Sequence, residues 1–191
     1  MKKFDCHKCF LRDQCTQPVM GEGSLTVKVI LIGEAPGRIE DARKRPFIGP
    51  AGQLLMHIIG KLGLKREDFY ITNVLKCWPS RGLPTAEKLQ ECMDACLPIL
   101  DEEIHRYKAK IVLLGGVALK RFIGNSLIAK YNEMEVDKGI WATYHPAFLL
   151  RNPAKTKELS IARTIYKACK AAGLKMKPQG EEYGFFHYKT F

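Results

Sequence analysis

The stretch that decides the fold is VKVILIGEAPGRIEDARKRPFIGPAGQLL, which occupies residues 27–55. Its first residues, Val27 to Ile32, are largely apolar and β-branched, a pattern typical of a strand that is buried on both faces. Gly33 ends this strand, and Glu34 follows it directly. Because ligands of open α/β sheets bind at the C-terminal ends of the strands, we expect Glu34 to lie at a binding site.

The second half of the stretch predicts a helix whose N-terminus can approach an anion. It reads PFIGPAG at residues 46–52 and continues with apolar residues at helical spacing from Leu54 to Leu62. Small residues at the start of a helix let its backbone N–H groups come close to an anion. An acid, a loop aromatic at Phe47 and an open helix N-terminus are therefore expected close together.

The rest of the chain alternates between strands and helices. The expected strands are 69–75, 110–116 and 140–144, and the expected helices are about 52–61, 84–107, 117–123 and 157–172. Such alternation is typical of an α/β protein whose parallel sheet is covered by helices on both faces. We therefore expect a single three-layer α/β/α domain with a mostly parallel, four-stranded sheet. No element is assigned to residues 125–139.

Length, composition and charge limit the possible classes of protein. The 191 residues, 46% of them apolar, suffice for one domain with a substantial core. Because the apolar runs are too short for a membrane span and no apolar leader follows Met1, we expect a soluble, cytoplasmic protein. The net charge of +11 favours a polyanionic partner such as nucleic acid, although a basic surface without a partner fits equally well.

Three polar side chains of different chemistry stand at the ends of expected strands. Glu34 follows the first strand, Asn73 lies near the end of the second, and His145 follows the last. In a parallel sheet these strand ends share one edge. Taken singly, an Asn or a His in such a position is more often structural than functional, but the three residues together favour a functional site.

The seven cysteines form a second pattern. Cys6 and Cys9 make a CxxC pair, in which two thiolates on a tight turn can hold a metal ion or one edge of a cluster. Cys77 and Cys92 form a second, widely spaced pair. The spacing is compatible with an iron–sulfur cluster, a zinc site or buried structural thiols. The remaining three are expected to be spare thiols: Cys15, Cys96 and Cys169.

Four motifs in a fixed order resemble the iron–sulfur (family 4) uracil-DNA glycosylases. They are GEAPGRIED at 33–41, PFIGPAGQLL at 46–55, TNVLKC at 72–77 and YHPAFLLRNP at 144–153. The resemblance covers roughly residues 6–170. It implies a monofunctional DNA repair enzyme that flips uracil out of single- or double-stranded DNA and hydrolyses its N-glycosidic bond, leaving an abasic site. It also implies a [4Fe–4S] cluster on Cys6, Cys9, Cys77 and Cys92.

The resemblance further implies roles for single residues. Phe47 would stack on the flipped base, Asn73 would read its Watson–Crick edge, and Glu40 would exclude the thymine methyl group. His145 would donate toward the departing uracil, while Glu34 would supply negative charge or hold a water near the sugar. The backbone of Ala35 and Gly37 would lie near the base. Leu149 or Leu150 would insert into the duplex, and Arg151 would pair with a phosphate.

Parts of the chain depart from the family. Lys44 stands where the family often has Gly, and the loop after Cys77 is one residue shorter. Residues 1–174 form the expected glycosylase domain, and residues 175–191 form a tail outside the resemblance. The tail is similar to a sliding-clamp-binding peptide, but Glu182 replaces its aliphatic residue. The sequence of the tail is therefore also compatible with a segment that packs on the domain or stays loose.

Two other functions remain open from the sequence. One is a pocket that captures uracil-containing DNA without turnover, and the other is a metal-stabilised DNA-binding module. Relatives that crosslink to DNA carry a basic, His-bearing insertion after the strand that contains Asn73. The loop between Trp78 and Pro84 has no such insertion. The favoured prediction is therefore a monomeric enzyme whose partner is uracil-containing DNA.

Overall fold

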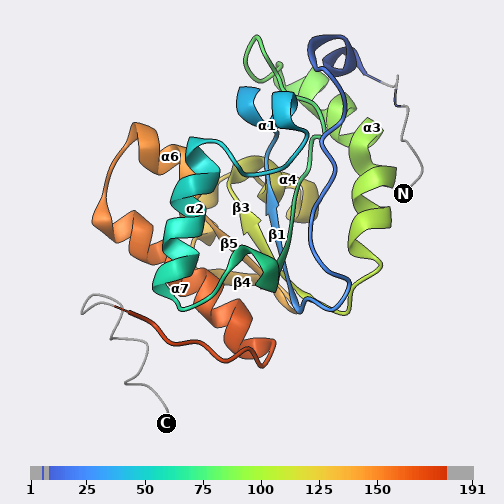
Figure 1. Ribbon diagram of the computed structural model, residues 1–191. Helices are drawn as coiled ribbons and strands as arrows, with labels where there is room; N and C mark the ends of the chain where they lie inside the picture. The colour runs from blue at the N-terminus through green and yellow to red at the C-terminus, as the bar shows by residue number, and fades with distance from the viewer. Residues whose placement is uncertain (1–5, 7–8, 180–191) are drawn as a thin grey trace.

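The computed structural model describes residues 6 and 9–179. Its centre is a five-stranded sheet with the strand order β2-β1-β3-β5-β4 (Figure 1). The strands are β1 (Val29–Gly33), β2 (Phe69–Asn73), β3 (Lys110–Leu114), β4 (Met134–Asp137) and β5 (Ile140–Thr143). All but β4 run parallel. Four strands therefore end at the same edge of the sheet, as the sequence predicts.

The central position of β1 explains why its sequence is apolar throughout. It pairs with β2 on one side and β3 on the other, which places Leu31 opposite both Ile71 and Val112. All five residues of β1 and all five of β2 are buried. Because helices cover both faces of the sheet, alternate residues of β1 enter two different cores.

The prediction of four strands is wrong by one strand. β4 lies inside residues 125–139 and pairs with β5 alone, in antiparallel register, with an irregularity between Glu135 and Asp137. Three of its four residues are exposed. A short edge strand of this kind alternates too weakly in polarity to be read from sequence, since Val136 alone of its four residues packs against a core. The hairpin to β5 turns at Gly139, whose φ is +81°.

Helices form the outer two layers of the fold, and they confirm the predicted α/β/α arrangement. They are α1 (Arg38–Arg43), α2 (Pro50–Lys61), α3 (Ala86–Ile104), α4 (Gly116–Ile123), α5 (Ile128–Tyr131), α6 (Pro146–Arg151) and α7 (Lys155–Ala171), with short 3-10 turns η1 (Phe10–Gln14) and η2 (Arg66–Asp68). Figure 1 shows α2, α6 and α7 on one side of the sheet and α3 on the other. The short helix α1 is not among the helices expected from the sequence.

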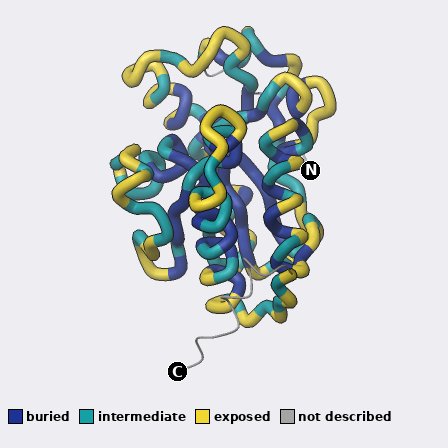
Figure 2. Tube along the Cα trace, turned by 90° about the vertical axis from the view of Figure 1, so that its left-hand side faces the viewer, coloured by how far each residue is buried: buried dark blue, intermediate teal, exposed yellow. Residues whose placement is uncertain are grey.

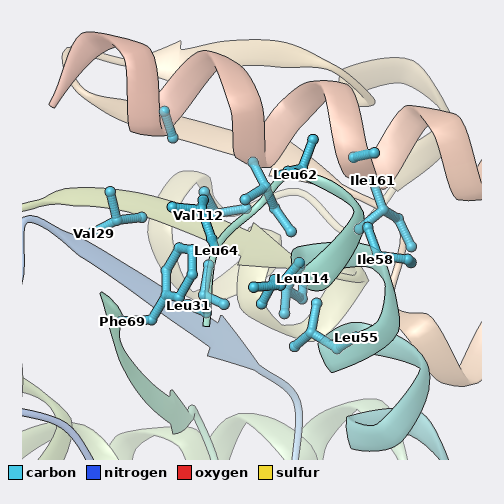
Figure 3. Packing of buried hydrophobic residues seen from close by; sticks show 14 of the residues in the cluster. Val29, Leu31, Leu55, Ile58, Leu62, Leu64, Phe69, Val112, Leu114 and Ile161 are labelled. Carbon is cyan, nitrogen blue, oxygen red and sulfur yellow. The ribbon is translucent and has the colours of Figure 1, made fainter. Parts of the chain in front are cut away.

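Two hydrophobic cores hold the layers together. On one face, Leu31 and Leu114 of the sheet pack with Leu55 and Ile58 of α2 and with Ile161 of α7 (Figure 3). The core on the other face joins the remaining side chains of the same strands to α3 and α4. Figure 2 shows these buried strands surrounded by partly exposed helices and exposed loops. The strand ends are thereby fixed in position.

The described segment of the tail continues along the end of α2. The N–H of Lys177 donates to the carbonyl of Leu62 at 3.1 Å, and the N–H of Gln179 donates to the carbonyl of Lys61 at 2.7 Å. The clamp-binding peptide suggested by the sequence covers residues 179–188, and all of it beyond Gln179 lies outside the described residues. Among the described helices, none combines the length and the apolar character needed to cross a membrane.

Candidate active site

A cavity of about 500 Å³ opens at the C-terminal edge of the parallel strands, a size within the range of small-molecule sites. The sequence-predicted site residues that line it come from segments far apart in the chain. They are Glu34, Ala35, Gly37, Glu40, Phe47, Asn73, His145, Leu150 and Arg151. The shared strand edge therefore brings together the polar groups that the sequence placed at separate strand ends.

Asn73 is the last residue of β2 and presents an unpaired acceptor to the cavity. The residue is 1% exposed, and its Oδ1 has no hydrogen-bond partner among the described residues. Gly33 is its neighbour on β1. A Cβ at Gly33 would lie 2.5 Å from that Oδ1 and 2.4 Å from Cζ of Phe47, so only glycine lets the amide and the ring approach the strand so closely. A buried, unpaired acceptor of this kind suits a ligand that donates a hydrogen bond.

Phe47 is held in an unusual backbone conformation. Its φ is +53°, which lies in the left-handed region that a bulky residue rarely adopts. The guanidinium of Arg66 donates to the carbonyls of Pro46 (2.7 Å) and Phe47 (3.1 Å). A Cβ at Gly52 would lie 2.1 Å from the carbonyl carbon of Phe47, so the start of α2 packs directly on this loop. These contacts aim the ring into the cavity.

Glu40 locks the same loop from the other side. Its Oε1 accepts hydrogen bonds from the N–H groups of Ile48 (3.0 Å) and Gly49 (2.7 Å), and the residue is 7% exposed. Because the carboxylate also lines the cavity, it contributes a fixed polar wall there. A Cβ at Gly37 would lie 2.8 Å from Oε2, so Gly37 leaves the space that the Glu40 side chain occupies.

His145 begins α6 and is oriented by the helix itself. Its Nδ1 accepts the N–H of Ala147 at 3.1 Å, so the proton of the neutral ring must lie on Nε2. That Nε2 is buried and has no partner in the described part of the chain. Burial and the nearby charge of Arg151 lower the pKa of His145 to about 4. At neutral pH the ring is therefore an uncharged donor beside the Phe47 ring, with their centroids 5.6 Å apart.

Glu34 follows β1 directly, and its pKa is shifted in the opposite sense. Burial raises the pKa of this carboxyl, while the charge of Arg151 partly opposes the shift. One arginine thus influences both titratable groups of the cavity. Titratable groups whose pKa values are shifted by burial in a cleft are typical of functional sites. The cavity therefore combines an acid, a neutral donor and an amide.

The two leucines of α6 lie in different surroundings. Leu150 is 48% exposed at the rim of the cavity, next to the exposed side chain of Arg151. Leu149 is 5% exposed and belongs to the core that α2 and α7 share. Of the two leucines proposed as the wedge, Leu150 is the better placed, because the side chain of Leu149 lies in the core. Leu150 and Arg151 are the two residues of this segment that face outward.

Six of the seven cysteines lie in the part of the fold formed by the N-terminal segment, the loop after β2 and α3. Cys15 is joined to Cys77 by a disulfide with a Cα–Cα distance of 5.3 Å, so the prediction that Cys15 is a spare thiol is wrong. Cys92 has a side-chain hydrogen bond with Cys9, and Cys96 lies near Cys6 and Cys9. Cys169 is buried in the opposite core, as expected of a small hydrophobe. Across residues 6 and 9–179, no group of three or more His, Cys, Asp or Glu side chains is arranged to hold a metal ion.

Sequence reasoning missed the residues that support the site from outside it. Arg66 holds the Phe47 loop by two carbonyls, and Asp41 accepts hydrogen bonds from the N–H (2.9 Å) and hydroxyl (2.7 Å) of Thr16. Trp78 also lines the cavity. Arg66 and Asp41 are polar residues near helix starts, a position in which most such side chains are simply solvated. Only their three-dimensional partners reveal their role.

Comparison with known sequences agrees with this geometry. The family described as "Uracil DNA glycosylase superfamily" matches residues 20–168. Over 167 residues the chain is 34% identical to the "Type-4 uracil-DNA glycosylase" of Archaeoglobus fulgidus, which covers 80% of this chain and 82% of the relative. The enzymes of the same name from Thermotoga maritima and Pyrobaculum aerophilum are 35% and 37% identical, covering 85% and 78% of this chain and 87% and 82% of the relatives. The chain belongs to the uracil DNA glycosylase superfamily. Within that superfamily, these three similar proteins are all type-4 uracil-DNA glycosylases.

Proposed function

We propose that the protein is a uracil-DNA glycosylase that acts in DNA repair and leaves an abasic site. The observation that carries this proposal is the pair of buried atoms without partners among the described residues, Asn73 Oδ1 and His145 Nε2, which line one cavity. Uracil offers a donor at N3 and an acceptor at O2, which match an amide oxygen and an imidazole N–H. Binding the base would relieve two unpaired polar groups at once.

Discrimination among bases follows from the same side chains. The amide of Asn73 can accept from N3–H of uracil and donate to O4, whereas cytosine presents an acceptor and a donor at those positions. Phe47 would provide the stacking surface for the extruded base. The fixed carboxylate of Glu40 would stand where a thymine 5-methyl group would have to enter, which gives rejection by steric clash. Backbone at Ala35 and Gly37 would lie near the base.

The proposed reaction needs only the groups already in the cavity. The bond between C1′ of the sugar and N1 of uracil breaks, and its electron pair leaves with the base. The neutral His145 donates from Nε2 to O2, where negative charge develops, and this donor stabilises the departing anion. Water adds to C1′, and the carboxylate of Glu34 holds that water and accepts its proton. A negative carboxylate also stabilises the cation-like sugar.

The surface around the cavity suits DNA. Leu150 would enter the space that the flipped nucleotide leaves, while Arg151 would pair with a phosphate. The net charge of +11 favours the polyanion overall. Extruding a base costs a few kcal/mol, and the stacking, wedge and phosphate contacts would offset that cost.

The function is tested by incubating the protein with a single-stranded oligonucleotide that contains one uracil. Subsequent alkali should cleave the strand at that position, and free uracil should be released. Oligonucleotides with cytosine or thymine at the same position serve as controls and should stay intact. DNA binding without base release would instead identify a protein that captures uracil-containing DNA without turnover.

The rate should depend on pH through Glu34. Because burial raises the pKa of this carboxyl above its usual value of 4.5, it becomes protonated while His145 is still neutral. The single-turnover rate should therefore fall on the acid side as Glu34 becomes protonated, at a pH above that at which His145 titrates near 4. Rates measured between about pH 4 and pH 8 would show this acid limb, and Glu34→Gln should be slow and lack it.

Arg151 provides a check on that assignment. Its charge lowers the pKa of Glu34, so Arg151→Gln should move the acid limb to higher pH. The single-turnover rate of this variant is measured with enzyme in saturating excess over DNA, so that weaker DNA binding does not affect the rate. An acid limb that stays in place in this variant, or that persists in Glu34→Gln, would mean that another group controls the rate.

We also propose a [4Fe–4S] cluster held by Cys6, Cys9, Cys77 and Cys92. Cysteine thiolates are the ligands of such clusters, and the close approach of Cys9 and Cys92 suits this donor set. The disulfide between Cys15 and Cys77 must be reduced before Cys77 can bind iron. When bound, the cluster would be structural and would tie the N-terminal segment to α3.

The cysteines can be told apart by substitution. Cys15→Ser frees Cys77 and should leave iron and acid-labile sulfide in the purified protein unchanged or higher. Cys77→Ser should lower both and remove the visible absorbance of the cluster, since thiolate ligands are lost. Metal analysis under anaerobic purification provides the measurement. Zinc instead of iron in the unaltered protein would contradict the proposed cluster.

The proposal further includes a monomeric enzyme that works on nucleoid DNA in the cytoplasm. Its partner is uracil-containing DNA. Contact with a sliding clamp through residues 175–191 is a weaker part of the proposal. The described start of that segment packs against α2, and the peptide beyond Gln179 lies outside the described residues.

A further inference from the structure

Lys76 is a fully buried lysine three residues after Asn73, and all three of its ammonium donors are engaged. Its exposure is 1%. Nζ donates to Thr72 Oγ1 (2.7 Å), to the backbone carbonyl of Asn73 (2.7 Å) and to Glu103 Oε2 (2.6 Å). Three donors with three acceptors leave the ammonium group one possible position. That position fixes the carbonyl of the residue whose amide enters the cavity.

Glu103 anchors this lysine to α3. It is 5% exposed, and its Oε2 accepts from Thr72 Oγ1 at 2.7 Å as well as from Lys76. Its other oxygen accepts the N–H of Gly21 at 2.7 Å, and Tyr70 adds a further hydrogen bond. The carboxylate thus joins the end of β2, the last turn of α3 and the segment that precedes β1.

The main chain of Lys76 is engaged as well. Its carbonyl accepts the N–H of Val19 at 2.7 Å, and its backbone lies close to the thiol of Cys96 on α3. Lys76 therefore touches the strand end, the cysteine-bearing helix and the N-terminal segment.

A buried ion pair is poor evidence for a contribution to stability. The cost of removing two charges from water offsets most of their attraction, and apolar pairs of similar volume often serve as well. What an apolar pair cannot do is donate a hydrogen bond to a defined carbonyl. The contact with Asn73 is thus the part of this network that burial alone would not supply.

We propose that Lys76 and Glu103 are positioning residues that fix the backbone of Asn73 and so aim its amide at the base. The inference rests on the proposed function, because Asn73 is useful in this way only if the cavity receives a nucleobase. The network would act through Asn73 alone and would touch neither the base nor the sugar. It would also link the placement of Asn73 to α3.

The test uses the full chain with the double substitution Lys76→Met and Glu103→Gln. Both charges are removed, the methionine keeps the shape of the lysine stem, and the glutamine amide can accept from Gly21 and donate to Thr72. The variant should fold, with its melting temperature and iron content close to those of the unaltered protein. The carbonyl of Asn73 loses its donor, and Thr72 changes from donor to acceptor in its contact with residue 103.

The double substitution should weaken uracil excision and uracil binding but leave the binding of abasic DNA nearly unchanged. The single-turnover rate of uracil excision should fall by about tenfold to a hundredfold, and the affinity for free uracil should fall by a similar factor, as expected for a misplaced group. Affinity for DNA with a non-cleavable abasic analogue should change by less than about threefold, because those contacts lie elsewhere. In an Asn73→Ala background the double substitution should have little further effect.

A matched control pair lies on the same helix end. Glu102 and Arg106 form an exposed ion pair, so Glu102→Gln with Arg106→Met removes the same charges without touching the strand. These substitutions should leave rate and uracil affinity unchanged.

Two results would overturn the inference. One is an unaltered rate and uracil affinity in the Lys76→Met, Glu103→Gln protein. The other is a parallel loss of uracil affinity, abasic-DNA affinity and melting temperature, which would indicate a purely structural role. The unaltered protein is assayed alongside. If it releases no uracil, the proposed function fails, whereas an active unaltered protein with an unaffected variant means that only the positioning role fails.

Discussion

Asn73→Ala is expected to lower the single-turnover rate of uracil excision by about three orders of magnitude. The substitution removes the amide whose Oδ1 is buried in the cavity without a partner among the described residues. Sites built to hydrogen-bond a ligand lose about 10⁴ to 10⁵ in discrimination when the pairing fails, and one lost transition-state donor alone costs about 10² to 10³. The measurement is uracil release under enzyme excess.

Asn125→Ala is the matched control for this prediction. Its side chain accepts the N–H of Leu127 at 2.8 Å in the turn before α5, away from the cavity. The control should excise uracil at the unaltered rate. Equal losses in the two variants would show that the effect of Asn73→Ala comes from weakened folding, and the assignment of Asn73 as the base-reading residue would fail.

His145 should account for the second large effect, a loss of about 10² to 10³ in the same rate on substitution. The ring has two separate tasks. Nδ1 caps α6 through Ala147, while Nε2 is the free donor that the reaction needs. His145→Asn keeps a good helix cap, since Asn is favoured at that position, but it shortens the reach of the donor.

Comparing His145→Asn with His145→Ala separates those tasks. Both variants should lose the rate, because both lack the imidazole N–H. Only His145→Ala should also lower the melting temperature, because it alone leaves the start of α6 uncapped. Full activity in His145→Asn would show that capping is the sole function of this residue. Circular dichroism melts and single-turnover rates on the same preparations provide both quantities.

The central strands were predictable because each buried strand is a run of consecutive apolar or β-branched residues. The apolar run of β1 and the β-branched run of β2 need no distant partner to be recognised. β4 was not predictable, since its four residues are mostly exposed and its pairing with β5 is set by a turn. An exposed strand at the edge of a sheet lacks the regular alternation of apolar and polar residues by which strands are recognised in a sequence.

The same distinction applies to the site. Glu34, Asn73 and His145 could be found because each follows a recognisable strand, and parallel strands end together. Lys76 could not, since a lysine after a strand usually lies in solvent, and its partner Glu103 is on a helix that begins later in the chain. The bond between Cys15 and Cys77 was equally hidden, because spacing does not determine which cysteines pair.

The strained backbone of Phe47 has a consequence for how the protein would meet its ligand. The loop is clamped by Arg66, by Glu40 and by the first turn of α2, so its ring is in place before any base arrives. The conformational entropy of ordering this loop is therefore lost during folding and does not have to be lost again on binding. The left-handed residue thus makes the cavity a rigid receptor, and under the proposed function the capture of a base would be limited by its extrusion from the duplex.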